Sequence, residues 1–346
     1  MKNKSVMKKV IWAVVSLIIA IFTVMAVVSQ SKSLSPADLL RALGDAKKLW
    51  LVLAVLLAAG FVWFEGTALR AILRSTGYKT KRSSAFLYSA SDIYFSAITP
   101  SATGGQPASA FFMMRDGLPV GVTTAVLVLN LMMYTLAIVF MGLISIILCP
   151  GAFVDFGSVS KVLIIIGFVG LIFLSLLFLS ILKRGEKVFI LIAKFLRFLH
   201  RKKIIKNLDA KLSKLETMMH DYESCSEIIA GRKSVMLKAF FWNVVQRASQ
   251  MAVPAVIYIA LHGQGRFGFT VFAKQCLITI GFNFLPIPGG MGISDYMMVD
   301  GFTGIMGEDM AFQIEMLSRG ITFYICVTVC AAITLIGYLM GRKKKV

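Results

Sequence analysis

Long apolar runs separated by short polar stretches dominate the hydrophobic pattern of the chain. Six of these runs are continuous and close to or above about 20 residues, the length at which an α-helix crosses a bilayer. We expect full spans at 10–28, 49–69, 119–148, 161–182, 236–260 and 311–340. The first run follows a basic N-terminus, as in a signal peptide, but it is longer than such a region usually is. We therefore interpret it as an uncleaved span.

Two further apolar segments are interrupted in the middle by proline and glycine. They cover 85–117 and 268–307, and their interruptions read ITPSATGGQP and FLPIPGGMG. Each half is short for a full span, although two full spans apiece would give the same sidedness. We predict that each segment is a re-entrant helical hairpin, which begins and ends on one side of the membrane.

The spans and hairpins form two matching sets. The set over 49–148 runs span, hairpin, span, and the set over 236–340 does the same in the opposite orientation. We predict an all-α polytopic helical membrane protein with about six full transmembrane helices and two re-entrant hairpins. It would form a single membrane domain over 1–346, built as an inverted repeat.

The two interruptions also correspond residue by residue. Pro100 and Pro286 are 186 residues apart, and Gly105 and Gly290 are 185 apart. In transporters, interrupted segments at matching positions of an inverted repeat mark the binding site. A short chance resemblance is the alternative.

Composition and charge agree with this membrane assignment. The chain is 58% hydrophobic and 16% charged, whereas soluble domains are about 45–50% apolar and about 25% charged. The basic residues that give the chain its net charge of +20 lie mainly in loops between the apolar runs. The positive-inside rule describes such an excess of Lys and Arg in cytoplasmic loops. We expect a multi-pass protein of the cell membrane with both termini in the cytoplasm, and no nucleic-acid partner.

The segment 183–234 is the only substantial part expected outside the membrane. Between 183 and 214 it carries eleven Lys or Arg against two acidic residues. An apolar stripe recurs there at helical spacing, formed by Val188, Ile192, Phe195 and Leu199. Such a helix could lie on anionic lipid headgroups; the alternative is an ordinary cytoplasmic loop.

The hairpin tips are the first candidate for the binding site of a transporter. Irregular backbone at membrane depth persists only when it is buried in protein or lines a water-filled cavity. Helices that start after each tip would direct free N–H groups toward the midplane, where they suit a phosphate or carboxylate. The alternative is a structural kink. The candidates are Pro100, Ser101, Thr103, Gly104, Gly105 and Gln106 at one tip, and Asn283, Pro286, Pro288, Gly289 and Gly290 at the other.

Charged residues within spans are the second set of candidates, because they usually face a cavity or a partner. Arg247 shares a helix face with Asn243, and its guanidinium could bind a phosphate in bidentate fashion. The alternative is an ion pair with Asp92 or Asp295 that only holds the bundle together. Arg319 allows the same two interpretations.

The acidic candidates differ in their position. Asp92 and Asp295 belong to the two hairpins, where each could take up a proton, bind a cation or neutralise an arginine. We expect Glu65, near a span end, to extend to the interface, and Lys274 to be an interface anchor. We find no catalytic fingerprint and no metal-ligand spacing, so we expect no cofactor and no metal.

Three motifs resemble a known family. The stretches TPSATGGQP, MMRDGLPVG and LPIPGGMGISD are similar to those of the lysylphosphatidylglycerol synthase transmembrane family, also called flippase-like integral membrane proteins. The resemblance covers roughly 10–340. It implies a domain that moves aminoacylated phospholipid between leaflets, here expected to stand alone without the family's cytosolic aminoacyltransferase domain. Many members have Glu at the position of Gln106 and another Glu near Asp295, so a shared headgroup preference does not follow.

These observations predict a lipid translocase that moves a phospholipid between leaflets, with aminoacylated phosphatidylglycerol or a related lipid as substrate. Two alternatives remain. One is a phosphatidylglycerol lysyltransferase-type enzyme, and the other is a membrane scaffold for a separate synthase. The expected partners are the phospholipid itself and either a second copy of the chain or such a synthase.

Overall fold

The chain is built from helices throughout its described part, as predicted. The computed structural model describes residues 41, 43–99, 103–202, 207–285, 290 and 292–340, and no strand occurs among them. Together with the apolar character of the long helices, this makes the chain an all-α polytopic membrane protein. The span expected at 10–28 lies outside the described residues.

The predicted first set consists of four helices. The long helix α3 (Lys48–Ser75) is followed by the two hairpin halves α4 (Arg82–Ile98) and α5 (Gly105–Arg115), and then by α6 (Val120–Leu148). The hairpin halves have 17 and 11 residues, fewer than the roughly 20 residues that a full span needs.

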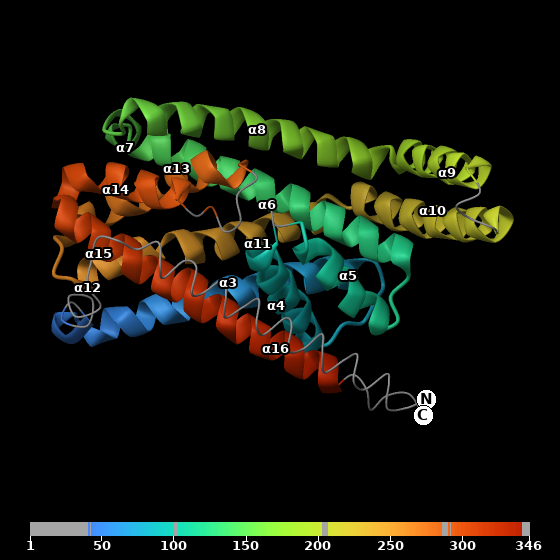
Figure 1. Cartoon of the computed structure of the whole chain (residues 1–346), viewed down its shortest axis with the longest axis horizontal. Coiled ribbons are helices and arrows are strands. Elements are labelled where there is room, and N and C mark those ends of the chain that lie inside the picture. Colours follow the sequence, from blue (N-terminus) through green and yellow to red (C-terminus); the bar gives the residue numbers. More distant parts are fainter. Residues whose placement is uncertain are drawn as a thin grey trace.

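Between the two sets lie four further helices. A single turn, α7 (Gly151–Val154), leads into α8 (Ser158–Lys183). The next two helices, α9 (Gly185–Arg201) and α10 (Leu208–Gly231), extend beyond the spans at the end opposite α7 (Figure 1). On α9, Phe195 of the predicted apolar stripe is 57% exposed, so this stripe remains open on the protein surface.

The predicted second set has more breaks than the first. Its helices are α11 (Lys233–Met251), α12 (Val253–Ala260), η2 (Gly265–Phe267), α13 (Gly268–Asn283), α14 (Ile293–Met306), α15 (Glu308–Arg319), the π-helical turn η4 (Gly320–Ile325) and α16 (Cys326–Met340). The span expected at 236–260 is divided at Ala252, because Pro254 lacks an N–H donor and crowds the preceding turn. Each hairpin half here has 16 or 14 residues.

Four helices in the described part are long and apolar enough to cross a membrane. They are α3, α6, α8 and the continuous rod from Glu308 to Met340. Large apolar side chains cover the outer face of α8; Val169 is 65% exposed and Phe173 is 62% exposed. Lipid chains would cover such a surface, whereas water would not stabilise it.

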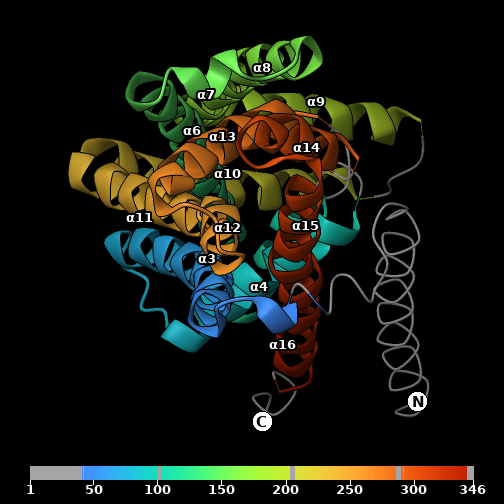
Figure 2. The ribbon, with the colours of Figure 1, turned by 90° about the vertical axis from the view of Figure 1, so that its left-hand side faces the viewer.

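Each hairpin packs against a helix of the other set. α3 and α11 lie against each other, α4 packs against α16, and α13 packs against α6. Seen from the end that carries α7 and α12 (Figure 2), α8 lies on one flank, and α3 and α16 lie on the other. Each hairpin therefore contacts the last span of the other set, which is the packing that an inverted repeat would produce. The inverted orientation itself stays a prediction.

One close contact between helices gives a stability prediction. A Cβ at Gly167 of α8 would lie 2.1 Å from the backbone oxygen of Ile280 in α13, so alanine there forces the two helices apart. We expect Gly167→Ala to lower the free energy of unfolding by about 1–3 kcal/mol, read as a fall in Tm in detergent. Gly304→Ala is the matched control, since nothing lies within 4 Å of its Cβ. Equal Tm values for the two variants would contradict the packing.

Candidate functional site

Residues of both hairpins, of α3, α6, α8 and α11, and of the rod from Glu308 to Met340 line one cavity of about 490 Å³. Residues of both hairpins contribute to its wall, Thr103 and Gln106 from the first and Asn283 and Gly290 from the second. Polar side chains of the wall are Glu65, Asp92, Ser96, Thr103, Gln106, Asn130, Tyr134, Thr135, Arg247, Gln250, Gln275, Thr279, Asn283, Ser294, Ser318, Arg319 and Thr322. A polar cavity between apolar helices is the feature that the broken segments predict.

Arg247 of α11 is a buried cation in this wall, only 5% exposed. Its Nη1 donates to Gln250 Oε1 at 2.7 Å, and its Cζ lies 3.7 Å from the ring centroid of Tyr134. The Nε–H is buried and has no hydrogen-bond partner among the described residues. No direct ion pair joins Arg247 to a described carboxylate, and its binding of a phosphate stays a prediction.

Glu65 of α3 is buried and does not extend to the interface. It is 6% exposed, and its Oε2 accepts hydrogen bonds from Ser89 Oγ and from Gln246 Nε2, both at 3.2 Å. The expectation of an interfacial Glu65 is therefore wrong, because α4 and α11 cover this face of α3 and supply the donors. Its carboxylate instead lines the cavity.

Asp92 of α4 lies beside Glu65 and is held by the first hairpin. Gln106 Nε2 donates to its Oδ2 at 2.7 Å, and Ser96 Oγ donates to its Oδ1 at 3.1 Å. The side chains of Asp92 and Glu65 line the same wall of the cavity, one from α4 and the other from α3.

Gly105 allows this hairpin to close. A Cβ at Gly105 would lie 2.0 Å from Asp92 Oδ1 and 2.0 Å from Ser96 Oγ. Only glycine lets α5 begin this close to α4, so that Gln106 reaches Asp92. The preceding Gly104 donates its N–H to Thr99 Oγ1 at 2.9 Å.

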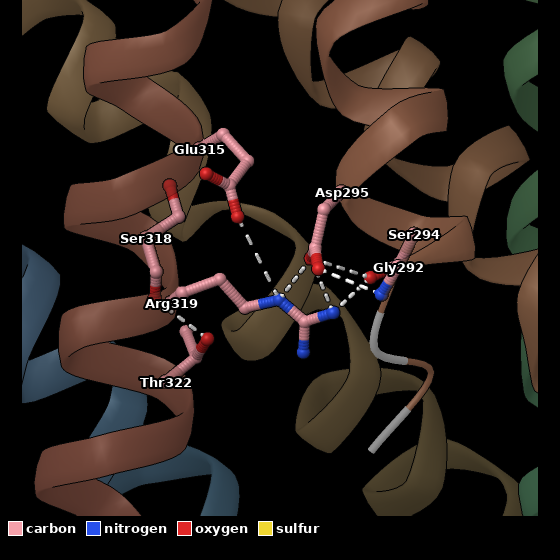
Figure 3. Close-up of polar contacts among 7 residues, drawn as sticks. All are labelled: Gly292, Ser294, Asp295, Glu315, Ser318, Arg319 and Thr322. Carbon is pink, nitrogen blue, oxygen red and sulfur yellow. Dashed lines mark hydrogen bonds and ion pairs between the residues drawn. The ribbon is translucent and has the colours of Figure 1, made fainter. Parts of the chain in front are cut away.

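The second hairpin begins α14 on a left-handed turn. Gly290 has φ +67° and Gly292 has φ +80°, a conformation that favours glycine. The Gly292 N–H donates to Asp295 Oδ2 at 2.8 Å, so Asp295 caps the helix. The same carboxylate accepts from Arg319 Nε at 2.6 Å (Figure 3).

Arg319 thus links the start of α14 to the end of α15. Besides Asp295, it donates to Ser294 Oγ, and its Nε lies 4.0 Å from Glu315 Oε1. Of the two alternatives for Arg319, the ion pair is the one observed, although its side chain also lines the cavity. The π-helical turn η4 begins directly after Arg319 and brings Thr322 and Phe323 to the wall.

The Asp295–Arg319 contact gives a second prediction. In a double-mutant cycle with Asp295→Asn and Arg319→Gln, we expect a coupling free energy of about 1–3 kcal/mol, because the pair is partly buried. Thermal unfolding of the four proteins in detergent measures it. Strictly additive effects would mean that the two side chains do not stabilise each other.

The predicted site residues divide into three groups. Those that line the cavity are Asp92, Thr103, Gln106, Arg247, Asn283, Gly290 and Arg319. Those beside it are Gly104, Gly105, Asn243 and Asp295; Asn243 Nδ2 donates to Asn130 Oδ1 at 3.1 Å. Those outside the described residues are Pro100, Ser101, Pro286, Pro288 and Gly289.

The sequence analysis did not identify several polar residues of the cavity, and Tyr134 and Asn130 are two of them. They lie within the apolar run 119–148, four positions apart and therefore on one helix face. The Arg247 guanidinium lies over the Tyr134 ring, and the Tyr134 hydroxyl donates to Asn283 Oδ1 at 3.2 Å. A polar side chain within this apolar run was the signal that could have identified them.

Lys274 does not anchor at the interface as expected. It is 0% exposed, and its Nζ lies 3.4 Å from Asp155 Oδ2 and 5.2 Å from the ring centroid of Phe156. The loop between α7 and α8 covers this lysine, so its pair with Asp155 joins that loop to α13.

The chain is similar in sequence to known proteins. The family described as "Lysylphosphatidylglycerol synthase TM region" matches residues 11–330. A UPF0104 membrane protein from Archaeoglobus fulgidus is 24% identical over 285 residues, which cover 81% of this chain and 84% of the relative. The family match includes both hairpins and every cavity residue named above. The chain therefore belongs to the lysylphosphatidylglycerol synthase transmembrane family, as its three motifs indicated.

Proposed function

We propose that this integral membrane protein moves a phospholipid between the two leaflets. The headgroup would occupy the cavity between the hairpins while the acyl chains stay in the bilayer. The observation that carries the proposal is Arg247, a buried guanidinium in a polar cavity with an N–H that no described residue satisfies.

An arginine in this state is suited to an anion. A buried cation with an unmade hydrogen bond is unfavourable, because its N–H has left water without gaining an acceptor. A phosphate diester supplies both the negative charge and the acceptors that a guanidinium binds in its planar geometry. Tyr134 and Gln250 hold the guanidinium in place for that contact.

The carboxyl groups of Glu65 and Asp92 determine what else the headgroup carries. They line the same cavity as Arg247 and come from α3 and α4. In a headgroup with an amine beyond its phosphate, the phosphate would contact Arg247 and the ammonium would contact the carboxyl groups of Glu65 and Asp92. An aminoacylated phospholipid has this chemistry, and the name of the family supports the same class.

The orientation follows from the distribution of basic residues. The positive-inside rule would place α9 and α10, and with them the cytoplasmic ends of α3 and α11, on the inner side of the cell membrane. Hairpins that enter from opposite sides and line one cavity would let that cavity open alternately to each leaflet.

A reconstituted flipping assay tests the proposal. Liposomes with the purified protein would contain trace NBD-labelled phosphatidylglycerol, lysyl-phosphatidylglycerol or phosphatidylcholine, and dithionite would bleach the outer leaflet only. We expect bleaching beyond the outer-leaflet half for lysyl-phosphatidylglycerol, and less for phosphatidylcholine. Bleaching equal to that of protein-free liposomes for all three lipids would overturn the proposal.

A further inference from the structure

A second groove of about 700 Å³ lies on the other side of α3 from the cavity. It is bounded by the last turns of α3, the start of α4 and the start of α11. No residue that lines this groove lines the cavity around Arg247. The groove is therefore separate from the proposed translocation site.

Five basic side chains from these three elements converge on the groove. Arg70 and Arg74 come from α3, Arg82 from α4, and Arg232 and Lys238 from the beginning of α11. No acidic residue lines the groove, and none of the five makes an ion pair with a described carboxylate. Basic loops that only obey the positive-inside rule need not gather in one concave place, so this convergence calls for an anionic partner.

Two tryptophans line the same groove further along the helices. Trp63 lies on the same face of α3 as Arg70 and Arg74, seven residues before the first and eleven before the second. Trp242 follows Lys238 by one turn of α11. The ring centroid of Trp63 lies 5.8 Å from that of Phe86, with the two rings tilted by 51°, and Trp63 is 46% exposed. The groove thus changes from basic to aromatic along its length, in the order in which a phospholipid changes from headgroup to acyl chain.

Two of the basic side chains also hold the rim in shape. Arg70 Nε donates to Thr80 O at 2.9 Å, and Arg232 Nη1 donates to Ser75 O at 3.3 Å. Each bond uses one of the five N–H donors of a guanidinium, which leaves the fork available for a phosphate. Gly66 keeps α3 and α4 in close contact beneath the groove, since a Cβ there would lie 2.8 Å from Ala85 O.

We propose that this groove binds an anionic membrane phospholipid, with the phosphate among the five basic side chains and the glycerol and upper acyl chains against Trp63 and Trp242. The site lies at the ends of α3 and α11 that the charge distribution assigns to the cytoplasm. It is independent of translocation, since the groove can hold a lipid whether or not the cavity moves one.

Tryptophan quenching by brominated lipids tests this inference. In a Trp12→Phe, Trp50→Phe background, Trp63 and Trp242 are the remaining tryptophans. The protein is reconstituted in phosphatidylcholine with a minor fraction of brominated phosphatidylglycerol, or with the same fraction of brominated phosphatidylcholine. We expect stronger quenching by the anionic lipid, and the ratio of the two gives a relative binding constant.

The groove variant carries Arg74→Gln, Arg82→Gln and Lys238→Gln, one change on each element. We expect the relative binding constant to fall by roughly fivefold or more. The matched control, Lys48→Gln, Lys161→Gln and Arg266→Gln, removes the same number of positive charges outside both the groove and α9 and should keep the wild-type value. Single changes at Arg74 and Lys238 provide the measurement if the triple variant does not fold.

Three results would overturn the inference. One is equal quenching by both lipids in the parent protein, and another is an equal loss in the groove and control variants. The third concerns a soluble ligand. Inorganic phosphate is added to the protein in pure phosphatidylcholine and compared with chloride at equal ionic strength, and we expect no change in fluorescence. A saturable change that the groove variant loses, without excess quenching by the anionic lipid, would overturn the inference and assign the groove to free phosphate.

Discussion

Replacing Arg247 with alanine is expected to reduce the rate of lipid flipping by about thirtyfold or more. Truncating a buried charged partner of a hydrogen-bonded ligand costs about 2–5 kcal/mol, and each 1.4 kcal/mol is a factor of about ten. We expect Arg247→Lys to restore little activity, because an ammonium cannot lie flat on the Tyr134 ring or bind a phosphate in bidentate fashion. The dithionite assay measures both variants.

Arg266→Ala is the matched control for Arg247. Arg266 is also an arginine next to an aromatic ring, 4.7 Å from the centroid of Phe267, but it is exposed in the loop before α13. We expect wild-type flipping from this variant. If Arg247→Ala flips lipid at the wild-type rate while folded, Arg247 does not hold the headgroup and the proposed function loses its main support.

The double replacement Glu65→Gln, Asp92→Asn is expected to destabilise the protein more than any other change of two charges in the described part. It removes both acidic groups that share the cavity with Arg247 and leaves this cation buried without a compensating charge. We expect the free energy of unfolding to fall by roughly 2–4 kcal/mol, with a loss of flipping. Thermal unfolding in detergent measures the first effect.

A third replacement separates the electrostatic explanation from simple misfolding. Adding Arg247→Met to the double variant removes the uncompensated cation, and we expect most of the lost Tm to return while flipping stays absent. The pair Glu308→Gln, Asp309→Asn is exposed and serves as a control with the same change of charge. A triple variant no more stable than the double variant would show that the carboxyl groups stabilise the fold independently of Arg247.

The positions of the helices and their breaks could be predicted from the sequence because both signals are local. Apolar runs and paired Pro and Gly placed the hairpins at 85–117 and 268–307, and the structure has their halves within 82–115 and 268–306. The division of the span 236–260 was also readable, since Pro254 lies inside it. The signal was overlooked there because the run is otherwise continuous.

The partners of charged side chains could not be predicted in this way. Glu65 lies near the end of the predicted span 49–69, and Arg319 lies at the end of α15, where an exposed position and a buried one look alike in sequence. Burial of Glu65 depends on donors from Ser89 and Gln246, which are 24 and 181 residues away. Assignment of Asp295 to Arg319, and not to Arg247, depends likewise on how α14 and α15 pack.

The sequence does not tell which property of a glycine is used at each break. Gly105 has an ordinary φ and lets α5 approach Asp92. Gly290, by contrast, does adopt a left-handed conformation. The two glycines align in the predicted repeat, and yet they allow different kinds of contact.

The rod from Glu308 to Met340 makes the protein dependent on bilayer thickness. Its 33 residues extend ~50 Å at the rise of an α-helix, which exceeds the roughly 30 Å hydrocarbon core of a typical membrane. A rod of this length fits the bilayer by tilting where its apolar part exceeds the core, and a thicker bilayer makes it more upright. Because Arg319 on this rod is paired with Asp295 on α14, a change of tilt pulls directly on the second hairpin tip. Lipid chain length would then act on the cavity without any ligand entering it.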